Sequence, residues 1–116
     1  MSNLPVNDIK KRSELLIQTI CHQQLSTISN LFQEPIWEGY LPTMQEGWKI
    51  LEKQHGQCID YECLLTERFE DGYLSNYRLS MTHSSLYIII YLTQNLQFES
   101  FDFSSQALPN NSLGPE

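Results

Sequence analysis

The segment 86–92, with the sequence LYIIIYL, constrains the fold of this chain more than any other stretch. Successive side chains of a strand point to opposite faces, and here both rows are apolar. The two rows are Leu86, Ile88, Ile90 and Leu92, and Tyr87, Ile89, Tyr91 and Thr93. An antiparallel strand with one face in water alternates between apolar and polar residues. We therefore predict that both faces of this segment are covered.

The surrounding sequence predicts four consecutive antiparallel strands. Residues rich in β-formers are separated by turn residues, including the Asp71-Gly72 dipeptide and the His83-Ser84 pair. Asn95 breaks the third strand from the fourth. The histidine beside hydroxyls at 82–85 is interpreted as a turn, because sequence neighbours in a turn do not make a catalytic pair. The predicted strands span 58–68, 73–82, 85–93 and 97–103.

Two helices are predicted ahead of these strands. Apolar residues at three- and four-residue steps favour a helix from Asn7 or Asp8, capped by one of those side chains, to about Phe32. Residues 34–40 are expected to be irregular, and a second helix runs from Leu41-Pro42 to Gly56. Gln24 falls within the apolar stripe of the first helix. It either bonds a local carbonyl or water or points into a cavity.

These elements predict an α+β fold, with two main N-terminal helices packed on a four-stranded antiparallel sheet. The 116 residues fit one domain, which we place at 8–103, between a flexible N-terminus at 1–7 and a flexible polar tail at 104–116. The apolar stripes of the helices need a surface to cover. One face of the sheet provides it, and so one row of the segment 86–92 is expected to lie under the helices.

The other sheet face needs a different cover. We assign to it Tyr87 and Tyr91, together with Tyr73, Tyr77 and Met81, which share a face of the second strand. A second subunit packed there would account for these residues, since aromatic residues and methionine are enriched at interface centres. A strongly curved sheet folded around a pocket is the alternative. We favour the homodimer.

The amino-acid composition limits the binding partners and the location that we predict for this chain. The net charge is −7, from 14 acidic and 7 basic residues, which disfavours nucleic acid and anionic membrane surfaces. No stretch approaches the ~20 apolar residues of a membrane span, and no signal peptide core is present at the N-terminus. Three cysteines, an odd number, favour free thiols in a reducing compartment, so we expect a cytoplasmic location. No metal-binding or cofactor-binding motif occurs, and we assign no metal site and no cofactor.

The stretch LPTMQEGWKILEKQHGQCIDYE, together with the order of the predicted elements, is similar to a known protein layout. A helix with Trp48 and Leu51 leads through Gly56 into a long strand, after a long N-terminal helix and before an antiparallel meander. This layout, over about residues 8–103, resembles the nuclear transport factor 2-like superfamily, the cystatin-like α+β cone, and within it a small bacterial branch of undescribed function. The resemblance implies a curved sheet wrapped around the long helix, a cone-shaped hollow, and frequent dimerisation through the outer sheet face.

Enzymes of that superfamily, similar to ketosteroid isomerase or scytalone dehydratase, place aspartates, histidines or tyrosines in the hollow. No such signature matches this sequence, so no active-site residue is carried over. The candidates for acid–base chemistry are Asp60 and Glu62, two apart and therefore on one face of a strand, with His55 just before it. A solvated sheet face is the alternative interpretation of the two carboxylates.

The sequence leads us to consider three alternative functions. The leading prediction is a non-catalytic homodimeric module that binds a small apolar or aromatic molecule or another protein, with Gln24 and Trp48 as further pocket or interface residues. The second is an isomerase- or dehydratase-like enzyme that uses the acid–base candidates in the cone. The third is an adaptor whose acidic first hairpin meets a basic surface. That hairpin carries Asp60, Glu62, Glu67, Glu70 and Asp71.

Overall fold

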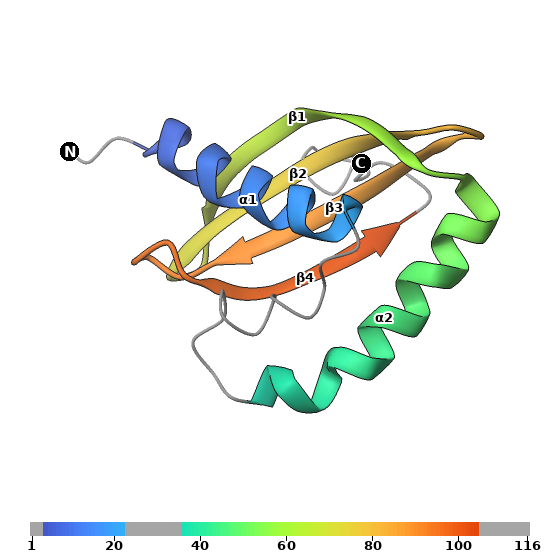
Figure 1. The fold of residues 1–116 in the computed structure, drawn as a ribbon. Helices are drawn as coiled ribbons and strands as arrows, with labels where there is room; N and C mark the ends of the chain where they lie inside the picture. The colour runs from blue at the N-terminus through green and yellow to red at the C-terminus, as the bar shows by residue number, and fades with distance from the viewer. Residues whose placement is uncertain (1–3, 23–35, 105–116) are drawn as a thin grey trace, which may run out of the picture.

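The computed structural model describes residues 4–22 and 36–104, with the side chains of the second stretch described from residue 42 onward. Two helices precede a four-stranded antiparallel sheet with strand order β1-β2-β3-β4 (Figure 1). This confirms the α+β fold, and each strand ends within one residue of its predicted bounds. The elements are α1 Val6–Cys21, α2 Ile36–His55, β1 Cys58–Phe69, β2 Gly72–Met81, β3 Ser85–Leu92 and β4 Phe98–Ser104.

Helix α1 differs from its predicted bounds at both ends. Its N-cap residue is Pro5, with no side-chain cap, so the cap predicted at Asn7 or Asp8 is wrong. The first hydrogen bond of the helix runs from the Ile9 N–H to the Pro5 carbonyl, at 3.0 Å. The helix ends at Cys21, although apolar periodicity continues in the sequence. Leu4, which precedes the helix, packs against the core. Gln24 lies outside the described residues.

Helix α2 begins at Ile36, five residues before the predicted start, so the irregular segment expected at 36–40 is wrong. Pro42 therefore lies inside the helix rather than in its first turn. Proline lacks the N–H that would bond the carbonyl four residues back, which is why the sequence favoured a start at this point. The end at Gly56 is confirmed, and this glycine has a φ of 91°, a conformation that glycine adopts readily.

Contacts with α1 define the two faces of the sheet. The Ser13 hydroxyl lies 2.7 Å from that of Ser75, and the Tyr77 hydroxyl donates to Glu14 Oε2 at 2.8 Å. These contacts place the odd-numbered row of β2 under α1, and we call this side the helix face. Tyr77 pairs with Ile88 across the strands, so the even-numbered row of β3 lies on the same side. That row is at most 1% exposed, as predicted for one row of this strand. Its members are Leu86, Ile88, Ile90 and Leu92.

The opposite side, the outer face, has no helix over it among the described residues (Figure 1). Arg78 pairs with Tyr87 and Leu74 pairs with Tyr91, so these residues share the outer face. The tyrosines that we grouped in the sequence are therefore separated. Tyr73, Tyr77 and Met81 lie on the helix face, because the register of β2 against β3 aligns odd with even residue numbers. The outer face consists of Asp60, Glu62, Leu65, Glu67, Phe69, Leu74, Asn76, Arg78, Ser80, Ser85, Tyr87, Ile89, Tyr91, Ser100, Asp102 and Ser104.

The core lies between the helices and the helix face. Helix α1 contributes four residues that are at most 1% exposed, namely Ile9, Leu16, Ile17 and Ile20. Helix α2 contributes Trp48, whose ring centroid is 5.4 Å from that of Phe103 on β4. Register shifts interrupt β1 between Cys58 and Asp60 and between Cys63 and Leu65. Bulges of this kind bend a strand, and β1 curves over the sheet in Figure 1.

A disulfide links Cys21, at the end of α1, to Cys58, at the start of β1. The prediction of three free thiols is therefore wrong for two of them, and Cys63 alone is free. Sequence spacing gave no indication of the pair, because the cysteines are 37 positions apart and all of α2 lies between them. The argument for a reducing compartment loses its basis, and the cytoplasmic location stays a prediction. No helix within the described ranges is long and apolar enough to cross a membrane.

Candidate functional site

The centre of the outer face is aromatic and aliphatic. Tyr87, Ile89 and Tyr91 of β3 are each half-buried there. Phe69, at the end of β1, is 40% exposed, and its ring centroid lies 5.2 Å from that of Tyr91. We call these four residues the outer aromatic patch. Sheet faces that point to water are normally polar. Apolar patches that remain on a folded chain mark interaction sites.

A buried polar atom lies under this patch. Asn76 is 3% exposed and pairs with Ile89 across the strands. Its Oδ1 atom is buried and accepts no hydrogen bond. Leaving a buried acceptor unsatisfied costs about 1–3 kcal/mol. A donor from a molecule seated on the outer face would remove that penalty.

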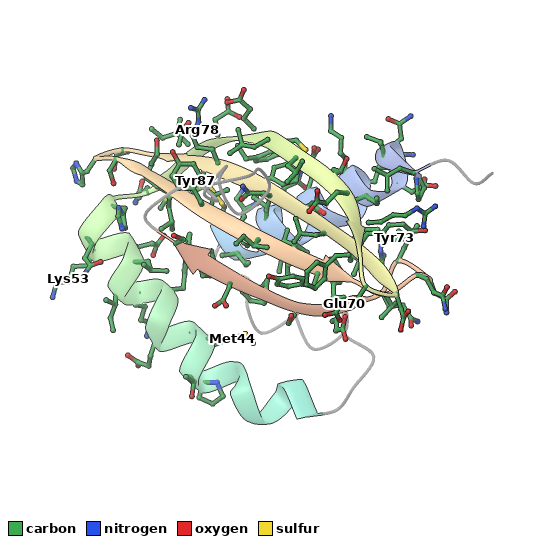
Figure 2. The ribbon with its side chains drawn as sticks, turned by 180° about the vertical axis from the view of Figure 1, so that it is seen from behind. Met44, Lys53, Glu70, Tyr73, Arg78 and Tyr87 are labelled. Carbon is green, nitrogen blue, oxygen red and sulfur yellow. A yellow bond between two sulfur atoms is a disulfide. The ribbon has the colours of Figure 1, made fainter. Side chains whose placement is uncertain are left out.

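Charge is distributed unevenly along the outer face. Arg78 forms an ion pair with Glu62 near the end of the sheet that also carries Tyr87. Glu70 lies at the opposite end, in the turn between β1 and β2 (Figure 2). The Arg78 end of the face therefore carries a guanidinium beside the carboxylates of Glu62 and Asp60, and the Glu70 end carries carboxylates.

Two of the acid–base candidates lie on an exposed part of β1, and the third lies at the end of α2. Asp60 and Glu62 are both exposed on β1, where Asp60 Oδ1 accepts from the Tyr61 N–H at 2.8 Å and Glu62 pairs with Arg78. His55 ends α2, and its Nδ1 atom bonds the Ser84 hydroxyl in the turn between β2 and β3. This placement matches the solvated-face interpretation of the two carboxylates. His55 therefore has a structural role, because its hydrogen bond links the end of α2 to that turn.

Three of the predicted pocket or interface residues are parts of the core. Tyr77 is fully buried, and Tyr73 and Met81 are at most 9% exposed. Burial, then the hydrogen bond to Glu14, raises the pKa of Tyr77 well above its usual range, so its hydroxyl stays protonated and acts as a donor. A group held in this state is suited to fixing α1 on the sheet rather than to proton transfer.

Trp48 lies on the side of α2 that faces the core. It is 3% exposed, and its Nε1–H is buried without an acceptor. Phe103 covers the indole on one side, and Phe103 in turn contacts Phe101 at 5.7 Å between centroids. An indole N–H without an acceptor among the described residues thus lies in the core between α2 and the helix face.

A hollow of about 280 Å³ at one end of the sheet was not foreseen from the sequence. It lies where the β1–β2 turn meets the loop between β3 and β4, and we call it the end hollow. The turn itself was predicted from Asp71-Gly72, but its proximity to the second loop depends on the strand order. The end hollow is lined by Phe69, Glu70, Asp71, Gly72, Tyr73, Tyr91, Leu92, Thr93, Gln94, Asn95, Gln97 and Glu99.

The fold and these sites define a small α+β protein with two helices ahead of an open four-stranded antiparallel sheet. No family model, no curated protein and no solved structure matches the chain. In the described parts of the chain, no group of three His, Cys, Asp or Glu residues is placed to hold a metal ion.

Proposed function

We propose that this chain is a non-catalytic homodimeric interaction module with a nuclear transport factor 2-like layout, and that two copies pack through their outer faces. The observation that carries the proposal is the outer aromatic patch, which is apolar on the side of the sheet that no described helix covers. A second copy would bury Tyr87, Ile89 and Tyr91 fully. It would also bring donors near the unsatisfied Asn76 Oδ1 atom.

The charge distribution supports a second copy as the occupant. In a two-fold interface the same surface patch is used by both subunits. A two-fold axis between the faces, running across the strands near Asn76, places the Arg78 end of each copy over the Glu70 end of the other. Arg78, which pairs with Glu62 in its own copy, would then lie opposite Glu70 of the other copy, twice in the dimer, and this contact would favour one register of the two sheets.

Light scattering with matched variants tests the dimer. The wild-type chain is expected at twice 13.6 kDa at micromolar concentration. Ile89→Arg introduces a charge into the patch and is expected to give the monomer mass. Ile50→Arg is the control, because Ile50 is an isoleucine on α2 that is 56% exposed and lies away from the outer face. A wild-type monomer, or equal dissociation by both variants, would overturn the proposal.

A second candidate function is the binding of a small aromatic molecule between α2 and the helix face. The unpaired Trp48 Nε1–H favours it, since a ligand carbonyl or carboxylate would accept this bond. Titration with benzoate should shift the Trp48 indole resonance, identified by its loss in Trp48→Phe. Phenol, which lacks the carboxylate, should shift it less. An indole resonance that benzoate leaves unmoved contradicts this candidate.

The isomerase- or dehydratase-like alternative has less support, because the described lining of the end hollow does not include Asp60, Glu62 or His55.

A further inference from the structure

We propose that the end hollow is a binding site for an organic cation, an alkylguanidinium or alkylammonium group. This goes beyond the proposed dimer and does not depend on it. The hollow lies at the end of the two central strands, and it takes residues from the β1–β2 turn and from the β3–β4 loop. Its volume of about 280 Å³ is just below the range of ~300–1,000 Å³ that is usual for ligand pockets, and it therefore suits a small group.

An aromatic pair forms one wall of the end hollow. Phe69 and Tyr91 are 5.2 Å apart between centroids, with their ring planes at 53°. Gly72 pairs with Phe69 and is a further residue of the lining. A Cβ atom added at Gly72 would lie 2.0 Å from the Leu92 carbonyl oxygen, so this position is restricted to glycine. The faces of aromatic rings attract cations.

The chain already places a guanidinium on a ring next to the hollow. The Arg68 Cζ atom lies 5.5 Å from the ring centroid of Tyr73, a residue of the lining. Tyr73 is on the helix face, whereas Phe69 and Tyr91 are on the outer face. The Tyr73 ring is thus occupied by Arg68, and the Phe69–Tyr91 wall is on the opposite side of the sheet.

Carboxylates give the lining of the end hollow its negative charge. Glu70, Asp71 and Glu99 line the hollow, and its described lining includes no lysine, arginine or histidine. None of the three takes part in an ion pair with another described residue. With Arg68 at its edge, the hollow keeps a negative balance at neutral pH, in a chain whose net charge is −7. This balance favours cations and repels anionic ligands.

The far wall is a preformed loop. Thr93 Oγ1 accepts from the N–H groups of Asn95 and Gln97 at 3.3 and 3.2 Å. Arg12 of α1 donates to the Leu96 carbonyl at 3.0 Å and holds the loop against the helix. A wall fixed in this way loses little conformational freedom when a ligand binds. The amides of Gln94, Asn95 and Gln97 offer acceptors for the N–H groups of the cation.

An organic cation fits this lining better than a metal ion, because the rings bind diffuse charge and no described cluster has metal-ligand geometry. Two sources can supply the group. One is a free small molecule. The other is Arg78 of a second copy, which the proposed two-fold arrangement brings over this end of the face.

The test is a nuclear magnetic resonance titration with n-butylguanidinium, and n-butylurea serves as the neutral control of the same shape. Saturable shifts at Gly72, Tyr91 and Asn95 are expected with the cation and not with the urea. Phe69→Leu and Glu99→Gln should each weaken binding at least about three-fold. Asp60→Asn removes an exposed carboxylate outside the hollow and should leave the affinity unchanged.

Equal shifts with the urea, or equal weakening by Asp60→Asn and Glu99→Gln, would overturn the site. Arg78→Gln separates the two sources. Tighter n-butylguanidinium binding by this variant identifies Arg78 of the second copy as the resident cation, and unchanged binding identifies a free ligand. Light scattering on the same samples reports the dimer independently, so that cation binding by a monomer supports the end hollow and contradicts only the dimer.

Discussion

At the scale of single residues, Tyr77 shows how one side chain changes role between sequence and structure. On a strand pattern it is one of several tyrosines that could line a pocket. In the fold it is fully buried under α1, and its hydroxyl donates to Glu14. The Ser13–Ser75 pair and the bond from Gln18 Nε2 to the Tyr61 hydroxyl, at 2.8 Å, join α1 to the sheet in the same way. Apolar residues therefore pack α1 against the sheet, and the polar contacts determine where on the sheet it lies.

The raised pKa of Tyr77 predicts a loss of stability at high pH. The folded chain keeps a proton that the unfolded chain releases above its ordinary pKa of about 10. The contribution is complete below that pH, and above it the free energy of unfolding falls by up to about 1.4 kcal/mol per pH unit. Urea unfolding from pH 7 to pH 11 should show this fall.

Tyr77→Phe is the matched variant for that experiment. It loses the bond to Glu14 and is expected to be about 1 kcal/mol less stable at pH 7. Since it has no hydroxyl to ionise, the gap to the wild-type chain should shrink above pH 10. If the free energies of unfolding of the two proteins fall in parallel above pH 10, Tyr77 is not the cause of the loss of stability at high pH.

At the scale of elements, the junction between α2 and β1 is held from two sides. Gly56 ends α2, and the His83 and Thr82 N–H groups donate to the His55 and Gln57 carbonyls, both at 2.9 Å. These bonds fasten the junction to the β2–β3 turn. The disulfide from Cys21 to Cys58 fastens it to the end of α1. The entry into the sheet is thus fixed by covalent and hydrogen bonds together.

Removing the disulfide should reduce stability markedly. Its cysteines are 37 residues apart, and closing a loop of that length stabilises the folded chain by about 3–4 kcal/mol through the unfolded state. Cys21→Ser with Cys58→Ser is expected to lose this amount in denaturant unfolding. Cys63→Ser, which alters the free cysteine, is the control and should lose less than about 1 kcal/mol.

A reducing agent should lower the wild-type stability to the level of the double variant and leave that variant unchanged. Wild-type stability that does not respond to reduction would mean that the two thiols are not joined in solution.

At the scale of the whole molecule, the sheet has one buried side and one partly exposed side. The helix face and the two helices enclose the core, whereas the outer aromatic patch is only half-buried. A net charge of −7 makes copies repel at long range, so their association depends on the patch and on the local pairing of Arg78 with the acidic end.

If the dimer is the folded unit, apparent stability depends on protein concentration. Dilution shifts the balance toward separated chains by mass action, and each ten-fold dilution should lower the free energy of unfolding by about 1.4 kcal/mol per dimer. Melting temperatures measured over three decades of concentration check this. Ile89→Arg should melt at one temperature throughout, and a wild-type melting temperature equally independent of concentration contradicts a folding-coupled dimer.

Much of the fold could be predicted because its signals are local. The Asp71-Gly72 and His83-Ser84 turns and the runs of β-formers fixed the strands, and Gly56 fixed the end of α2. The helix starts were less predictable. Pro42 is tolerated inside α2, and the residue at the N-cap of α1 is Pro5, which provides no side-chain cap. Of the site, the sequence indicated Tyr87, Tyr91 and Trp48. It gave no sign of the unsatisfied Asn76 oxygen or of the end hollow.

The sequence by itself determined the order and type of the elements and the two apolar rows of β3, since side-chain alternation and turn chemistry act over a few residues. Only the tertiary structure decided which tyrosines face the helices, which cysteines meet, and which loops enclose a hollow. Each of these depends on register and on contacts between residues far apart in the chain. A register shift of one residue exchanges the two faces of a strand and leaves its local pattern intact.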